Sequence, residues 1–391
     1  MAKRIGSPLV GTRLVGTRLV GMLLVGMLLV ATLLVATACT GSRSAARHPE
    51  RSVKGADQPH PTTATPTTTA TSSTAGPGAT APPPAAPATV APRPSPGCNS
   101  ETAKEVSPDV FRTALTHDGL TRTYWLQVPD GYDGTTPVPL VIDLHGFGEG
   151  AQVHLAMSGL PAYGRSHGFA TVVPQGNGTP AFWNGFGAPA PAPDDVKFFG
   201  SLLDELTANL CIDTARVDVA GLSNGAFMAS LLACELPGRV AAVAAVAGVQ
   251  FPAPCAAAPP KSVLAIHGTA DTFVGYDGGF GPGVTSLGLD PGALAGITMS
   301  PVPDIVRRWA EHDGCGASPT KQPLAADVRE TRYTGCAAGN EVALVTVEGG
   351  GHAWPGSEFS ARVEPAVGHT TMSVSANDLI WEFFSRHPLA G

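Results

Sequence analysis

The chain has 391 residues, of which 43% are hydrophobic and 14% are charged, and it contains 47 glycines and 37 prolines. This length allows one large domain or two small ones, and the Gly and Pro content indicates a loop-like part beside a globular one. The formal net charge of −7 argues against a basic surface, so we expect no nucleic-acid partner.

The first 39 residues have the pattern of an export segment. Basic residues precede an apolar run from about Leu19 to Ala38, which is the order of regions in a signal peptide. The run ends in VATAC, and small residues before Cys39 resemble the lipobox of bacterial lipoproteins, in which that cysteine is lipidated. Ala36 departs from the leucine that is usual there. Plain cleavage after Ala38 and an uncleaved membrane anchor are the alternatives. We expect lipidation at Cys39 and an extracytoplasmic protein held at the cell membrane by this anchor, or else secreted.

Residues 40–97 are rich in Thr, Ala, Pro and Ser and have almost no large apolar residues. Such a segment cannot bury enough surface to fold, and its prolines stiffen it. We therefore expect a disordered tether that precedes a catalytic domain of residues 98–391.

From Cys98 onward, strand-like runs alternate with stretches of helical periodicity. The expected strands are 111–116 and 122–128, paired as a hairpin, then 139–144, 169–173, 216–220, 240–247, 262–266 and 341–347. The expected helices are 196–210, 226–236, 304–311 and 377–386. Near-continuous apolar strands between helices predict an α/β fold, with a mostly parallel central sheet covered on both faces. The strands' carboxyl ends then share one edge, where such sheets carry their sites.

The segment Gly221-Leu222-Ser223-Asn224-Gly225 lies directly after a predicted strand and directly before a predicted helix. That is the context of a G-x-S-x-G nucleophile elbow. Small residues on both sides let the backbone turn sharply, and the helix N-terminus points its free N–H groups toward developing negative charge. We therefore predict Ser223 as a nucleophile.

A serine needs a base, and the base needs an acid that orients it. His352 follows the last strand within a glycine run, and Asp271 follows the strand 262–266, which gives the chain order Ser, Asp, His. Asp277 is the nearest rival acid, and His267 has the pattern of a structural residue in the same turn.

An oxyanion formed at this serine requires backbone N–H donors. We expect one from Asn224, the residue after the nucleophile, and one from Phe147, in the loop that closes the strand 139–144. His145 in that loop is expected to hold it by a hydrogen bond.

Residues 110–385 resemble the polyhydroxybutyrate depolymerase and feruloyl esterase family of α/β-hydrolases. The matching motifs are DLHGFG (143–148), FWNGFG (182–187), DDVKFF (194–199), LCIDTARV (210–217), GLSNGAFMA (221–229), HGTADTFV (267–274) and GGGHAWPG (349–356). The resemblance implies an α/β-hydrolase fold and the triad Ser223, Asp271 and His352. It also implies that Trp183 and Asn184 lie near the site as pocket residues, with a core aromatic as the alternative for Trp183.

Phe147, Trp183 and Trp354 together indicate an apolar, partly aromatic substrate pocket, and we expect Trp183, Asn184 and Trp354 to bind substrate. The glycine-rich residues 275–300 are expected to form a loop over the site. No substrate-binding module follows the last helix, which favours soluble or short esters over solid polymer.

Six cysteines follow Cys39, an even number that indicates three disulfides in an exported chain, with buried free thiols as the alternative. Position along the chain pairs Cys315 with Cys336. It also allows Cys234 with Cys255 and leaves Cys98 for Cys211, although six cysteines permit 15 pairings. The spacing matches no C-x-x-C or H-E-x-x-H metal site, and we expect neither a metal nor a cofactor.

These features predict a monomeric serine carboxylic ester hydrolase that acts through an acyl-enzyme on short hydroxyalkanoate or feruloyl-type esters. The same triad supports acyl transfer, as in envelope mycolyltransferases, or peptide cleavage. A non-catalytic envelope lipoprotein that uses the fold for binding is the third alternative.

Overall fold

The computed structural model describes residues 90–389, except 108, 110, 189–191, 290–293 and 295–296. The predicted signal peptide with Cys39, and the tether up to residue 89, lie outside the described residues. Within the described ranges, no helix is long and apolar enough to cross a membrane.

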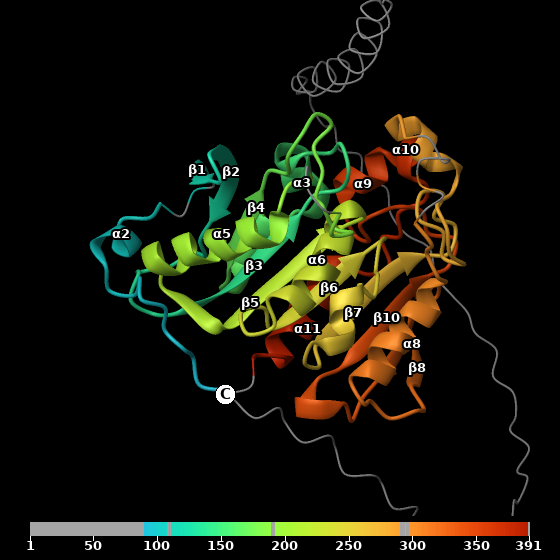
Figure 1. Cartoon of the computed structure of the whole chain (residues 1–391). Helices are drawn as coiled ribbons and strands as arrows, with labels where there is room; N and C mark the ends of the chain where they lie inside the picture. Colours follow the sequence, from blue (N-terminus) through green and yellow to red (C-terminus); the bar gives the residue numbers. More distant parts are fainter. Residues whose placement is uncertain are drawn as a thin grey trace, which may run out of the picture. The chain divides into compact units, whose positions relative to one another are not determined.

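One ten-stranded sheet organises the described residues, in the order β1-β2-β4-β3-β5-β6-β7-β10-β9-β8 (Figure 1). The five pairings among β4, β3, β5, β6, β7 and β10 are parallel, and antiparallel strands complete both ends. The mostly parallel sheet predicted from the apolar strands is therefore confirmed. The strands are β1 (Phe111–His117), β2 (Leu120–Gln127), β3 (Val138–Leu144), β4 (Ala170–Pro174), β5 (Ile212–Leu222), β6 (Ala242–Val246), β7 (Ser262–Gly268), β8 (Thr320–Ala325), β9 (Val328–Tyr333) and β10 (Val342–Val347).

Helices cover both faces of this sheet, as Figure 1 shows. One face packs against α5 (Asp195–Asn209), α6 (Asn224–Glu235) and α8 (Val302–His312), and the other against α3 (Ala151–Ser158), α4 (Leu160–His167) and α11 (Ala376–Arg386). The central strands divide between the two cores by alternation, since Leu140 and Ile142 of β3 face one core and Val141 the other. The shorter helices are α2 (Glu101–Lys104), α9 (Glu358–Arg362) and α10 (Glu364–Val367), with 3₁₀ turns η2 (Ala253–Ala257), η3 (Pro282–Leu287) and η4 (Ala337–Gly339).

Three disulfides close the domain, and all three pairs follow the expectation from position: Cys98–Cys211, Cys234–Cys255 and Cys315–Cys336. Disulfides of this number are typical of proteins that fold in an oxidising compartment.

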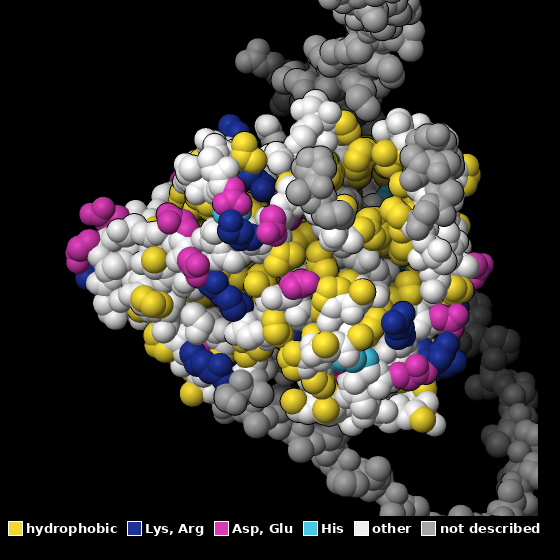
Figure 2. All heavy atoms as spheres, in the orientation of Figure 1, with side chains coloured by type: hydrophobic (Ala, Val, Ile, Leu, Met, Phe, Trp, Pro, Cys, Tyr) yellow, Lys and Arg dark blue, Asp and Glu magenta, His cyan; other side chains and the backbone are white. Residues whose placement is uncertain are grey.

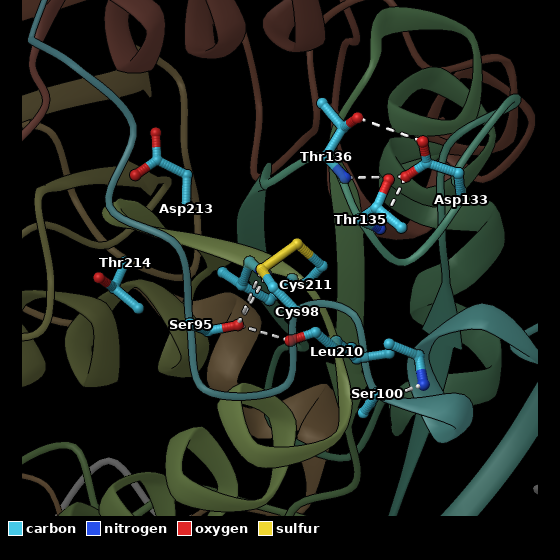
Figure 3. Close-up of a disulfide and its surroundings, with 12 residues drawn as sticks. Ser95, Cys98, Ser100, Asp133, Thr135, Thr136, Leu210, Cys211, Asp213 and Thr214 are labelled. Atoms are coloured by element: carbon cyan, nitrogen blue, oxygen red, sulfur yellow. Dashed lines mark hydrogen bonds between the residues drawn. A yellow bond between two sulfur atoms is a disulfide. The ribbon is translucent and has the colours of Figure 1, made fainter.

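The folded part begins earlier than expected. Figure 3 shows Ser95 beside the Cys98–Cys211 disulfide, where its hydroxyl donates to the carbonyl of Leu210 at 2.5 Å. The same oxygen accepts the N–H of Ile212 at 2.9 Å, and Pro94 forms a β-bridge with Asp213. Residues 90–97 therefore belong to the folded domain and not to the tether. Composition could not reveal this, because their backbone groups find partners on the distant strand β5.

Candidate active site

Ser223 lies in a sharp turn between β5 and α6, with φ 56° and ψ −116°. Positive φ costs a non-glycine residue roughly 1–3 kcal/mol, so the surrounding structure must hold it. A Cβ on Gly221 would lie 2.5 Å from the carbonyl carbon of Gly225, and a Cβ on Gly225 would overlap the carbonyl oxygen of Leu144 at the end of β3. The two glycines of the motif are therefore required because the turn packs backbone against backbone.

Asp271 and His352 meet across the ends of β7 and β10. His352 Nδ1 lies 2.8 Å from Asp271 Oδ2, and both side chains are buried. The other carboxylate oxygen, Oδ1, accepts the N–H groups of Phe273 at 2.8 Å and Val274 at 3.0 Å. The ring of Phe273 stacks on the imidazole with centroids 4.7 Å apart. The rival acid Asp277 is exposed.

The Asp271 carboxylate is held in its ionised form. Burial raises its pKa, but the neighbouring His352 and hydrogen bonds from His267 and His352 outweigh burial and bring the pKa well below its usual range. His267 Nε2 lies 2.9 Å from the carbonyl of Val274 and 3.3 Å from Asp271 Oδ2. His267 thus supports the turn that carries the acid, as the sequence predicted.

The glycine run before His352 lets two loops run in contact. A Cβ on Gly268 would overlap the carbonyl oxygen of Gly350. The Ala270 N–H donates to that carbonyl at 2.8 Å, and the Gly349 N–H donates to Thr269 Oγ1 at 2.8 Å. The loop of Asp271 and the loop of His352 are therefore joined directly.

Ser223 reaches the same edge of the sheet through the strand order, because β5, β6, β7 and β10 are successive parallel neighbours. Among the described residues, neither Ser223 Oγ nor His352 Nε2 makes a hydrogen bond. The structure thus joins Asp271 to His352, and it places Ser223 on the same edge without a direct bond to the imidazole. Catalytic hydrogen bonds of this kind often tighten only when substrate is bound.

Two backbone N–H groups flank the serine without an acceptor in the described part of the chain, those of Phe147 and Asn224. In the loop after β3, the neighbouring N–H groups are occupied, with Gly146 donating to Glu149 Oε2 at 2.7 Å and Gly148 to the carbonyl of Ala181 at 2.8 Å. A Cβ on Gly146 would lie 3.6 Å from Ser223 Cβ, so this loop runs beside the nucleophile elbow. An oxyanion hole requires free, preorganised N–H donors next to the nucleophile.

His145 holds this loop and carries no charge. Its Nδ1 lies 2.7 Å from the carbonyl of Gly146, and its Nε2 accepts the N–H of Gly176 at 2.8 Å. Burial is the main cause that lowers the pKa of His145 to about 4, so the ring is neutral near pH 7. The structural role predicted for this histidine is confirmed.

The three residues predicted to bind substrate all make hydrogen bonds inside the domain. Trp183 is 1% exposed, and its Nε1 donates to the carbonyl of His145 at 3.1 Å, while the Asn224 side chain bonds both its N–H and its carbonyl. Trp354 is also 1% exposed, with Nε1 donating to Asn377 Oδ1 at 3.0 Å. The Asn184 amide bonds the backbone of Ala188 and Pro193 in its own loop. Trp183 and Asn184 thus bond backbone carbonyls, whereas Trp354 bonds a side chain of α11, and the motifs alone did not predict these contacts.

Aromatic residues that the sequence analysis missed lie beside the elbow instead. Phe186 packs on Phe227, in the first turn of α6, with ring centroids 5.0 Å apart. Phe186 also borders a cavity of about 500 Å³. The lining is mixed, with Phe251, Ile297, Met299 and Ile305 beside the charged Asp304, Arg307, Arg308 and Glu311, and it does not include Ser223. Phe186, a lining residue of this cavity, therefore packs on the helix that follows Ser223.

The surface around the site is mixed in character. On the face drawn in Figure 2, acidic and basic side chains are interspersed. Hydrophobic side chains border a hollow on the side of α9 and α10, the two helices that follow the His352 loop (Figures 1 and 2). Among the described residues, no group of three or more His, Cys, Asp or Glu side chains is arranged to hold a metal ion.

The sequence comparisons point to one group of esterases. The family model described as "Esterase PHB depolymerase" matches residues 122–277. A protein named "Putative esterase NocK", from Nocardia uniformis subsp. tsuyamanensis, is 33% identical over 319 residues, which are 75% of this chain and 91% of the relative. Feruloyl esterase D from Neurospora crassa is 28% identical over 76% of this chain and 92% of its own length. Among solved structures, an acetyl xylan esterase from Aspergillus awamori superposes with a TM-score of 0.46 at 13% identity, over 66% of this chain and 98% of its own.

Proposed function

Because the chain belongs to the polyhydroxybutyrate depolymerase and feruloyl esterase family of α/β-hydrolases, and is an esterase, we propose that Ser223, His352 and Asp271 are its nucleophile, base and acid. The observation that carries this proposal is the buried 2.8 Å contact between His352 and Asp271, together with unpaired N–H groups at Asn224, which follows Ser223, and in the adjacent loop at Phe147. This combination supplies an oriented base and a prepared place for negative charge.

The proposed reaction proceeds in two steps through an acyl-enzyme. His352 Nε2 takes the proton of Ser223 Oγ as that oxygen attacks the ester carbonyl, and the N–H groups of Phe147 and Asn224 stabilise the resulting oxyanion. The imidazolium then gives its proton to the leaving alcohol. Water, activated by His352, attacks the acyl group, and the serine is regenerated. Asp271 fixes the tautomer and stabilises the imidazolium throughout.

Short-chain hydroxyalkanoate or feruloyl-type esters are the proposed substrates. The names of the feruloyl esterases among the relatives support this class. The cavity bordered by Phe186 and Phe251 offers aromatic side chains for an aromatic acyl group, beside polar and charged residues such as Gln250 and Arg308.

The proposed location is extracytoplasmic, with a lipid anchor at Cys39. The basic and apolar N-terminal pattern and the three disulfides support this proposal. In cells fed a labelled fatty acid, the wild-type chain should carry label and fractionate with membranes. Cys39→Ala should carry none, and label retained by that variant would refute the anchor.

Ser223→Ala tests the nucleophile. This variant should abolish hydrolysis of p-nitrophenyl butyrate and covalent labelling by a fluorophosphonate. Ser230→Ala is the matched control, since Ser230 is buried on the same helix and donates to the carbonyl of Ala226. Turnover or labelling that survives in Ser223→Ala would refute the assignment.

A panel of acetyl, butyryl, hydroxybutyryl and feruloyl esters tests the substrate class. We expect the highest kcat/KM on hydroxybutyryl or feruloyl esters, and a clear preference for the acetyl ester would contradict the proposal. Product analysis with and without trehalose separates hydrolysis from acyl transfer, because a transferase forms an acyl sugar.

A further inference from the structure

We propose that Asp143, His154 and Glu149 form a buried charged chain that positions the oxyanion loop, residues 145–148, beside Ser223. The proposal rests on the proposed function, because it concerns the loop that supplies the Phe147 N–H. It assigns positioning roles to three residues that do not contact the reacting atoms.

The chain runs through continuous hydrogen-bond contacts from β3 to the loop. Asp143 Oδ1 lies 2.9 Å from His154 Nε2, and the opposite ring nitrogen, Nδ1, lies 3.0 Å from Glu149 Oε1. The second Glu149 oxygen, Oε2, accepts the Gly146 N–H at 2.7 Å. Asp143 is fixed in turn by the Ser158 hydroxyl, which donates to its Oδ2 at 2.6 Å.

Because these three side chains are buried, each of their charges must be paired within the chain. His154 and Asp143 are 0% exposed, and the Glu149 side chain is 10% exposed. With a carboxylate at each nitrogen, the imidazole serves both only when it is protonated, since both nitrogens then donate. The two carboxylates raise the pKa of His154 to about 10 although burial opposes this, and the charged ring in turn lowers the pKa of Glu149 against the effect of burial.

The contact at Gly146 explains why these charges matter for catalysis. The Gly146 N–H is committed to Glu149, whereas the next N–H along the chain, that of Phe147, stays free. Glu149 thus fixes the peptide unit immediately before the proposed donor. Since such donors act only when they are aimed at the oxyanion, a small rotation of this turn would weaken transition-state binding more than substrate binding.

His154 itself is not a candidate general base. Both of its nitrogens are occupied by carboxylates and its side chain has no exposed surface. Its edge also packs against Trp354, with ring centroids 5.8 Å apart, which locks the ring between the loop and the core.

Glu149→Gln tests the positioning role with little change of shape. The amide can still accept the Gly146 N–H, but its other half cannot take the place of a carboxylate facing a protonated His154. We expect kcat on p-nitrophenyl butyrate to fall about 10- to 100-fold, part of what loss of a whole oxyanion donor costs. KM should stay within about twofold, as expected for an interaction used mainly in the transition state.

A tetrahedral boronate adduct on the serine gives a second readout, because its oxygen occupies the oxyanion position. Its affinity should fall in parallel with kcat/KM in Glu149→Gln. His387→Gln is the matched control, since His387 is also a buried histidine but bonds the carbonyl of Phe383 in α11. This control should leave kcat and boronate affinity unchanged.

The outcomes separate this proposal from the function on which it rests. If Ser223→Ala remains active, the proposed function fails. If Ser223→Ala is inactive while folded Glu149→Gln keeps wild-type kcat and boronate affinity, the positioning role fails alone. Should Glu149→Gln not fold, ¹⁵N NMR of the wild-type histidines decides: His154 should stay protonated at both nitrogens to about pH 9, and titration near 6.5 would overturn the proposal.

Discussion

Asp271→Asn should inactivate the enzyme while leaving the fold in place. In the wild type, Oδ1 accepts two backbone N–H groups and Oδ2 faces His352 Nδ1 at 2.8 Å. An asparagine keeps the backbone bonds only by turning its NH₂ group toward the imidazole. His352 Nδ1 must then accept, so the proton moves to Nε2, the nitrogen that has to take the proton of Ser223.

The magnitude follows from the tautomer. A wrongly protonated base costs about 10⁴-fold in kcat in a comparable triad, which corresponds to about 5.5 kcal/mol in the activation free energy. Initial rates on p-nitrophenyl butyrate across pH 6–9 measure this loss directly, with circular dichroism to check the fold.

Asp313→Asn is the control for loss of a buried carboxylate. Asp313 is 0% exposed and contacts His312 at 2.7 Å, but it lies outside the site. It should keep near wild-type kcat. A loss of less than about tenfold in Asp271→Asn, or an equal loss in both variants, would show that the tautomer of His352 does not depend on this carboxylate.

Three further predictions concern stability. Gly225→Ala should lower the free energy of unfolding by about 3 kcal/mol or more, because its Cβ overlaps the Leu144 carbonyl. Gly200→Ala, inside α5 with open space around it, should raise that free energy by up to ~1 kcal/mol. Urea unfolding compares the two variants, and equal effects would contradict the predicted clash. His145 has a pKa of about 4 in the folded chain and near 6.5 in the unfolded chain, so the unfolded chain binds this proton first as the pH falls. Its contribution to stability is therefore full above pH 6.5, and about 2–3 kcal/mol is lost toward pH 4. The urea midpoint of His145→Gln should depend less steeply on acid pH than that of the wild type. Replacing Cys98 and Cys211 by Ala should lower the free energy of unfolding by about 4.8 kcal/mol, and replacing Cys315 and Cys336 by about 3.4 kcal/mol, because the sequence separations are 113 and 21. Guanidinium unfolding measures both losses, and the reverse order would show that loop length does not set the stabilisation by these disulfides.

Much of the central sheet could be predicted from the sequence because its strands are apolar on both faces. The run 139–144 became β3 and 262–266 became β7 within a residue or two of the expected bounds. The hairpin of β8 and β9 was missed, since β8 (TKQPLA) is exposed or half-buried and contains a proline, so it shows no apolar pattern. The pair α3 and α4 was also missed, because glycines interrupt it and α3 has no clear apolar stripe.

Part of the candidate site could likewise be predicted from the sequence, and part could not. Ser223, Asp271 and His352 could be proposed from the sequence because each follows a strand in a recognisable order, and the topology brings these positions to one edge of the sheet. Side-chain direction was not predictable, and Trp183 and Trp354 therefore proved to be core residues. The contact between Glu149 and His154 was not predicted either. Buried ion pairs of this kind have no local sequence pattern, and only the folded structure shows which side chains meet.

The attachment of residues 94–98 to the start of β5, through the Cys98–Cys211 disulfide and the Pro94–Asp213 bridge, determines where a pulling force acts. A pull on the chain ahead of residue 90 reaches the Cys98–Cys211 bond and the bridge of Pro94 to Asp213 before it reaches β1. Force is therefore delivered by a covalent link to a strand flanked by β3 and β6, and the edge hairpin of β1 and β2 lies outside the load path. Tension applied through the N-terminal segment is thus carried by β5 and not by the β1–β2 hairpin. Reduction of that single disulfide would shift the load to hydrogen bonds alone.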